Sequence, residues 1–281
     1  MRQTLFRSGF YFARVSAIME KNGPSRHIHT AEATALKRFF GKHGIIICVI
    51  IIIAIILADC YALYSDLAGE VFSDGGCGEV NIILDPGHGG EDGGAVTLTG
   101  RTEQELNLSI AQKTEQILAL FGTSCILTRE SGSVEYPDSA KTTRARKSAD
   151  TKARVELANS TPNAVFISIH QNKFGTDTQA HGAQVFFAPT EKSEELAKRL
   201  SDALTGAIGS ENVRAQTQIS KNIYIMNHIK CPAALVECGF VSNRRECEKL
   251  ESDGYQTVLA GSIASGIAQF AGDLNGGGNE T

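Results

Sequence analysis

An uninterrupted apolar run divides the chain into two parts of opposite charge. The run comprises fifteen uncharged residues, 44–58, of which nine are isoleucine. Before it, residues 1–43 carry eight basic and two acidic groups, a net charge of +6, whereas the whole chain of 281 residues carries −4. The remainder therefore carries −10. Because so apolar a run is a poor match to a soluble core, we expect the globular part of the chain to follow it.

The length and the flanks of this run are typical of a membrane anchor. Extended to residue 63, the apolar stretch reaches about twenty residues, enough for one membrane span. The positive-inside rule keeps a basic N-terminal flank in the cytoplasm and exports the residues after the span. We predict a basic cytoplasmic segment at 1–43 and a transmembrane signal anchor at 44–63, with the rest outside the cytoplasm. A cleaved signal, which would leave the protein secreted, and a buried core element remain as alternatives.

The composition excludes several classes of protein. A net negative charge argues against nucleic-acid binding, which needs a basic face. Seven cysteines without a CxxC pair exclude a dense disulfide framework and an all-cysteine zinc site. Residues 64–79 are rich in glycine and aspartate and are interpreted as a linker. This leaves 80–272 for a folded domain, and 273–281 are predicted to form a flexible tail.

From residue 80 onward, short apolar runs alternate with amphipathic segments. Strands are predicted at 80–84, 125–128, 164–169, 182–188 and 233–236, and helices at 103–121, 142–159, 193–208, 243–252 and 255–271. Ser193 is expected to cap the third of these helices. Such alternation predicts an α/β domain with a mostly parallel sheet and helices on both faces.

Three of the predicted strands lead into side chains that can bind a metal ion. His88 follows the first strand in a glycine-rich loop. His170 directly follows the strand at 164–169, and Glu237 directly follows the strand at 233–236. Sites in open α/β sheets form at the carboxyl ends of strands. A single histidine after a strand is usually an ordinary loop residue. Three strands that each lead into a side chain able to bind a metal ion favour a functional cluster. The loop glycines are expected to let the backbone turn sharply so that His88 projects into a cleft.

The order of these motifs resembles one enzyme family. The motifs are Asp85-Pro-Gly-His88-Gly-Gly, a glutamate opening an amphipathic helix, Ser168-Ile-His170-Gln-Asn172, and Val236-Glu237-Cys-Gly-Phe-Val-Ser-Asn243. Together they resemble the zinc-dependent N-acetylmuramoyl-L-alanine amidases of cell-wall metabolism (amidase type 3) over residues 80–271. The resemblance implies a twisted, largely parallel six-stranded sheet. Details also resemble the spore-cortex, germination-specific amidases, in which peptide removal prepares muramic acid for conversion to the δ-lactam.

The resemblance also implies a site. It assigns a zinc ion to His88, Glu103 and His170, and the catalytic role to Glu237. Two histidines and one carboxylate are a usual catalytic zinc set, with a fourth position for water. Glu237 would take the proton of that water and deliver it to the leaving amine. The implied substrate is peptidoglycan, and the bond cleaved joins N-acetylmuramic acid to L-alanine.

Other carboxylates lie close to Glu103 in the sequence. The family places its ligand eight residues before a small residue on the buried helix face, which is Ala111 here and favours Glu103 over Glu105. Glu91 and Asp92 in the glycine loop are the next candidates for the base if Glu237 is not the base.

Several polar residues are expected to be structural. Arg129 is predicted to pair with a carboxylate of the protein and not with the acidic peptide of the substrate. His181 and His228 are predicted to lie on the surface. The basic residues within 144–154 are predicted to form a solvated helix face, with weak contact to anionic wall polymer as the alternative. Asn172 is left open between orienting a loop and contacting substrate.

Two other functions remain compatible with the sequence. One is another zinc hydrolase of the wall, a peptidase or a deacetylase. The other is a non-catalytic wall-binding module on an inactive amidase fold, which would predict the loss of a ligand or of Glu237. All four residues are present. The need for an activator protein is left open.

Overall fold

The computed structural model describes residues 46, 49–59, 80–175 and 179–276. The chain divides into two compact units, Met1–Asp66 and Leu67–Thr281. In the first unit, residues 49–59 are helical and their isoleucine side chains are exposed. Within the described part of the chain, no helix combines the length and the apolar character needed to cross a membrane. The basic segment, the ends of the predicted anchor and the whole predicted linker lie outside the described residues.

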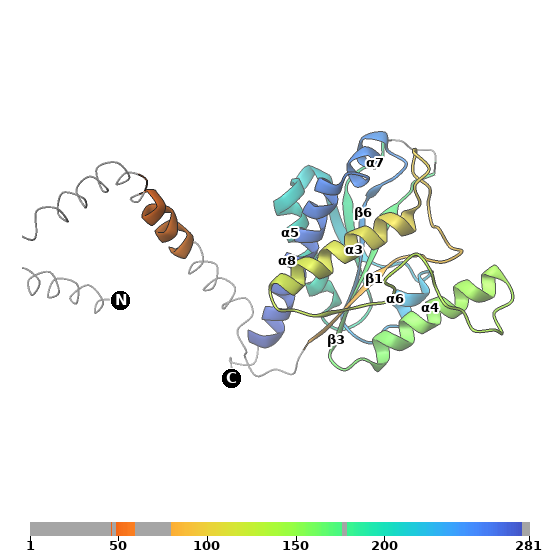
Figure 1. Cartoon of the computed structure of the whole chain (residues 1–281). Helices are drawn as coiled ribbons and strands as arrows, with labels where there is room; N and C mark the ends of the chain where they lie inside the picture. Colours follow the sequence, from red (N-terminus) through yellow and green to blue (C-terminus); the bar gives the residue numbers. More distant parts are fainter. Residues whose placement is uncertain (1–45, 47–48, 60–79, 176–178, 277–281) are drawn as a thin grey trace, which may run out of the picture. The chain divides into compact units, whose positions relative to one another are not determined.

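In the second unit, the described residues form one six-stranded sheet (Figure 1). Its strands are β1 (Asn81–Pro86), β2 (Cys125–Leu127), β3 (Ala164–Asn172), β4 (Ala183–Phe187), β5 (Val213–Gln218) and β6 (Ala233–Phe240). Their order is β2-β1-β3-β6-β4-β5, and all neighbours are parallel except the antiparallel pair β4 and β6. The prediction of a mostly parallel sheet is therefore confirmed. The periodicity missed β5 because this edge strand, VRAQTQ, is polar and has no buried residue.

Helices cover both faces of the sheet, as the sequence predicts (Figure 1). They are α3 (Glu103–Leu120), α4 (Thr143–Ser160), α5 (Ser193–Ile208), α6 (Tyr224–His228), α7 (Arg244–Leu250) and α8 (Asp253–Gly276). The side chains of β1 alternate between the faces: Ile82 and Leu84 pack with α3, α5 and α8, whereas Ile83 packs with α4 and α6. The α8 helix extends through Gly276, so the first four residues of the predicted tail are helical.

The start of α5 differs from the expectation. Lys192, with a φ of 61°, is the residue that precedes the helix, and Ser193 is its first helical residue. The Ser193 hydroxyl instead accepts a hydrogen bond of 2.9 Å from the backbone N–H of Ala233. The prediction that Ser193 caps α5 is wrong because its hydroxyl joins the helix to β6.

Candidate metal centre and active site

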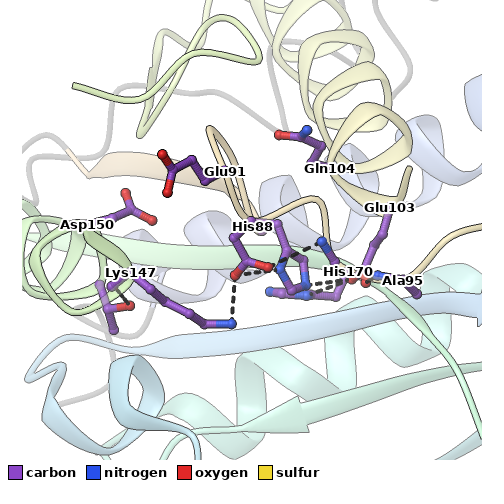
Figure 2. A network of polar contacts seen from close by, with 12 residues as sticks. His88, Glu91, Ala95, Glu103, Gln104, Lys147, Asp150 and His170 are labelled. Atoms are coloured by element: carbon purple, nitrogen blue, oxygen red, sulfur yellow. Dashed lines mark hydrogen bonds and ion pairs between the residues drawn. The ribbon is translucent and has the colours of Figure 1, made fainter. Parts of the chain in front are cut away.

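Two central strands and one helix start bring the predicted metal ligands together. His88 follows β1, His170 lies near the end of β3, and Glu103 is the first residue of α3. Nε2 of His88 lies 3.2 Å and Nδ1 of His170 lies 3.0 Å from Oε1 of Glu103. The three candidate ligand atoms lie within 4.8 Å of one another, and Figure 2 shows the three side chains directed toward one another. This spacing fits a single ion at about 2.0–2.2 Å from each ligand atom.

The position of Glu103 is fixed by backbone donors. Its Oε2 accepts a hydrogen bond of 2.8 Å from the N–H of Ala95, and its Oε1 accepts one of 3.1 Å from the N–H of Gln171. Burial alone would raise the pKa of Glu103, but hydrogen bonds from His170 and His88, with the charges of these rings, hold it well below its usual range. The carboxylate is therefore ionised, as a metal ligand has to be.

Glu105 serves the helix instead of the site. Its Oε2 accepts hydrogen bonds of 2.8 Å from both the N–H and the hydroxyl of Thr102, the residue that precedes α3. This is the glutamate half of a capping box, which satisfies donors at a helix start. The geometry agrees with the preference for Glu103 as the ligand.

Glu237 lies beside the ligands but makes different contacts. It stands opposite His170 in the register of β3 and β6. Its Oε2 atom is buried and has no hydrogen-bond partner in the described part of the chain. Burial raises the pKa of Glu237 to about 7. The charge of His170 lowers this pKa and the charge of Glu103 raises it, but both effects are smaller than that of burial. A carboxyl group with a pKa near neutrality can both accept and donate a proton in one reaction cycle.

The acidic residues of the glycine loop face the basic helix α4. Lys147 Nζ lies 2.7 Å from Asp92 Oδ2, which in turn lies 3.1 Å from His88 Nδ1. Arg146 forms an ion pair with Glu91. Both acids are therefore engaged with cations, which argues against either of them as the base. These ion pairs also show that the basic face of α4 contacts the glycine loop and is not purely solvated.

Arg154 shows the clearest departure from the predicted solvated face, because its side chain is buried. Its guanidinium pairs with Asp85 at 2.6 Å and donates to the carbonyl oxygens of Pro86 at 3.0 Å and His88 at 2.7 Å. Asp85 has no exposed surface and also accepts hydrogen bonds from two hydroxyls. The prediction of a solvated residue is wrong here because the partner carboxylate lies beneath the helix, at the end of β1.

Arg129 holds the same loop from the other side. It is buried, and its donors reach the carbonyl oxygens of Pro86, Gly87 and His88 at 2.8–3.0 Å. The structural role predicted for it is confirmed, although its partners are carbonyls rather than a carboxylate. The loop needs such support because His88 has a φ of 63°, a left-handed conformation that costs a non-glycine residue about 1–2 kcal/mol.

Glycine is required where the loop passes the second histidine. A Cβ atom at Gly87 would overlap the imidazole of His170. Gly89 and Gly90 have φ values of 140° and 58°, so the sharp turn expected of this loop is present. The loop can therefore lie against the end of β3 and carry His88 toward His170.

Two buried amides around the site were not predicted. Asn107 Nδ2 donates to the Gly87 carbonyl at 3.1 Å, and Gln171 Nε2 donates to Asn107 Oδ1 at 3.1 Å. The signal that could have found Asn107 is its position four residues after Glu103, on the buried face of the same helix.

The remaining candidates are not among the three converging ligands. His181 and His228 are exposed, as predicted. The backbone carbonyl of Asn172 accepts a hydrogen bond of 2.9 Å from the N–H of Val241, and the role of its side chain stays a prediction. Cys238 is buried, and burial raises the pKa of its thiol far above the usual value. Such a thiol is not a nucleophile near neutral pH.

Comparison with known proteins identifies the family. The sequence profile of the N-acetylmuramoyl-L-alanine amidases (Amidase_3) matches residues 82–269, well over half of the chain. The chain belongs to this amidase family. It is 34% identical over 190 residues to the germination-specific N-acetylmuramoyl-L-alanine amidase of Bacillus subtilis, which is 67% of this chain and 78% of that protein.

Solved amidase structures share the fold. The CwlD amidase from Clostridioides difficile, solved in complex with the GerS lipoprotein, has 34% sequence identity and a TM-score of 0.64, covering 68% of this chain and 98% of that one. The amidase AmiC2 of Nostoc punctiforme has 28% identity and a TM-score of 0.59, covering 70% and 99%. The six-stranded sheet is thus the sheet of the amidase family.

The buried pair of Asp85 and Arg154 makes a prediction about stability. Burial alone would raise the pKa of Asp85, but Arg154 and two hydroxyls hold it below its usual value near 4. Because the folded pKa lies below the unfolded one, this stabilisation is complete above about pH 5 and is lost as the pH falls. Asp85→Asn should lower the free energy of unfolding at pH 7 by about 3 kcal/mol, because it removes the buried carboxylate and leaves the guanidinium of Arg154 only the partly exposed Asp150 as an ion-pair partner. Urea unfolding between pH 7 and pH 3 measures both effects.

The matched control is Asp150→Asn. Asp150 also pairs with Arg154, at 2.9 Å, but is partly exposed. Its loss should cost under about 1 kcal/mol, as expected of an accessible pair. Two results would refute the assignment of this pH dependence to Asp85. One is an equal loss of unfolding free energy in the two variants, and the other is an Asp85→Asn variant whose unfolding free energy still falls with pH as in the unaltered chain.

Proposed function

We propose that this amidase hydrolyses the bond between N-acetylmuramic acid and L-alanine in peptidoglycan, with a zinc ion held by His88, Glu103 and His170. The observation that carries the proposal is the convergence of these ligand atoms within 4.8 Å. Family membership supports the amidase reaction over a wall peptidase, a deacetylase or a non-catalytic module.

The donor set fits zinc. Two imidazole nitrogens and one ionised carboxylate oxygen make up a usual catalytic site that leaves one position open. A zinc ion bound there supplies Lewis-acid activation of the attacking water and of the scissile carbonyl. Asn107 and the backbone donors orient Glu103, and the carboxylate of Asp92 lies 3.1 Å from His88 Nδ1.

Glu237 is assigned the proton transfers. Its Oε2 has a free lone pair in the described site and can accept the proton of the water. It then delivers this proton to the nitrogen of L-alanine as the C–N bond breaks. A pKa of about 7 suits both steps, since neither the acceptor nor the donor form is strongly disfavoured at neutral pH.

Zinc content and activity separate the two roles. Glu237→Gln keeps the side-chain volume and removes the proton acceptor, so the variant should retain about one zinc per chain while amide cleavage falls by about 10²–10⁴. His170→Ala should lose most of the zinc as well, because only two protein ligands remain. Zinc is measured by mass spectrometry of the metal, and activity by release of stem peptide with an N-terminal L-alanine. Loss of zinc from Glu237→Gln would instead make Glu237 a ligand.

A role in the spore cortex forms part of the proposal. It is supported by the 34% identity to the germination-specific amidase of Bacillus subtilis and by the likeness to CwlD. Since peptide removal exposes the muramic acid, spores of a strain that lacks this chain should contain no muramic δ-lactam in their cortex. Muropeptide analysis of cortex and vegetative wall measures this. Unchanged δ-lactam would contradict the cortex role without affecting the amidase reaction itself.

The CwlD relative was solved with a lipoprotein, so we include a partner of that class in the proposal. Adding a co-produced lipoprotein to the purified chain tests whether zinc content or cleavage depends on it.

We further propose that residues 44–63 anchor the enzyme in the membrane, with the catalytic domain outside the cytoplasm. The proposal is supported by the +6 charge before the run and by the exposed isoleucines of the helix at 49–59. Fractionation should recover the full-length chain with membranes, and a protease added outside the membrane should digest residues 80–272. Full-length chain in the cytosol, or a catalytic domain that stays protected in intact cells, would contradict it.

A further inference from the structure

A hollow of about 830 Å³ lies beyond the carboxyl end of β6. Its lining includes Leu98 from the loop before α3, His181 from the segment before β4, and Arg244, Arg245, Glu246 and Lys249 from α7. The hollow is distinct from the His88, Glu103 and His170 cluster, because none of these three residues lines it.

The lining of this hollow is cationic. Arg244, Arg245 and Lys249 are exposed. Neither guanidinium takes part in an ion pair or a side-chain hydrogen bond within the described part of the chain. The Lys249 ammonium lies over the Tyr255 ring, 5.8 Å from its centroid. The chain after residue 43 carries a net charge of −10, so three exposed basic groups around one hollow run against the average charge of this part of the chain.

The acid in the lining forms no ion pair with these groups within the described part of the chain. Glu246 is buried, and its carboxylate accepts hydrogen bonds from the backbone N–H groups of Gly182 at 3.0 Å and Phe240 at 2.9 Å. It thereby joins the start of β4 to the end of β6 and shapes the hollow. Its oxygens accept hydrogen bonds from these buried N–H groups and not from the arginines, whose donors stay available to a ligand.

The hollow and the candidate active site share one edge of the sheet. Its Ser242 follows Glu237 by five residues, and its Leu98 precedes Glu103 by five residues. Five residues span at most about 18 Å even when fully extended. The segment before β4 reaches the same edge because β4 runs antiparallel to β6, with Gln184 opposite Glu237. The hollow therefore lies at the same end of the sheet as Glu237, at a distance that a bound peptide of a few residues can span.

Guanidinium groups favour carboxylates, which they bind with two parallel hydrogen bonds. In the amide substrate, the sugar on one side of the scissile bond is uncharged. The stem peptide on the other side carries free carboxylates on its acidic residues and at its carboxyl terminus. We propose that the hollow lined by Arg244, Arg245 and Lys249 is a subsite that binds the carboxylates of the stem peptide. This inference rests on the proposed amidase function and names the part of the substrate that is recognised.

The test compares two substrates and two double variants of the full-length chain, one that reverses the charge of the arginines and one that keeps it. One muropeptide has free stem carboxylates, and the other has the same carboxylates converted to amides. Arg244→Glu combined with Arg245→Glu should lower kcat/KM about 10–100-fold on the first, mainly through KM, and leave the second within about two-fold, because only charge-assisted hydrogen bonds are lost. Arg244→Lys combined with Arg245→Lys should retain most of the preference.

The matched control is Lys221→Glu combined with Lys230→Glu. It changes the net charge equally, but both residues are exposed near the opposite edge of the sheet, after β5 and before β6. Thermal unfolding checks that all variants fold. Equal losses on both substrates in the arginine variant, or no loss on either, would overturn the subsite.

Direct binding separates this inference from the proposed function. Isothermal titration calorimetry of the full-length chain with free stem peptide requires no cleavage. Binding that disappears in the arginine variant but not in the lysine control supports the subsite even if the chain proves inactive as an amidase. If the peptide does not bind and a polyglycerol phosphate binds through the same arginines, the hollow is a site for an anionic polymer and the subsite proposal is overturned.

Discussion

The ion pair between Asp85 and Arg154 is the contact on which the candidate site depends. Desolvation of two charges offsets much of their attraction, so such a pair adds little net stability over apolar residues. Its effect here is positional. Arg154 uses the donors left over from Asp85 to bind the carbonyls of Pro86 and His88, which ties the loop to α4. With Arg129 on the other side, this holds His88 in its left-handed backbone conformation.

Much of the fold could be predicted because most strands of this domain are apolar and short. The strands β1, β3 and β6 are buried along nearly their whole length, so their apolar runs stand out in the sequence. The polar edge strand β5 has no such signal. The candidate ligands were found because they follow these strands, and parallel strands end at one edge. Their joint placement needed the resemblance to the amidases, since Glu103 comes from a helix start that hydropathy does not distinguish.

The contacts of α4 could not be predicted from its sequence. The helix has a low mean hydropathy, and only Arg154 and Ala158 are buried in it. The position of an arginine in a helical pattern does not show whether its side chain is buried or solvated. The carboxylate that pairs with Arg154 in the interior, that of Asp85, is 69 residues away in the chain. Long-range polar pairs carry no periodicity, so the support of the metal-ligand loop is visible only in the folded structure.

The partner of each carboxylate at this edge determines its chemistry. Asp85 is paired with Arg154 and Asp92 with Lys147, so both have a lowered pKa and stay ionised as structural anions. Glu103 lies between two imidazoles, which also lowers its pKa and suits it to a cation. Glu237 has no basic side chain bonded to it in the described site, and burial raises its pKa to about 7. Among these four acids, Glu237 alone lacks a bonded cationic partner, and this difference is the physical basis for proposing Glu237 as the base and Glu103 as the ligand.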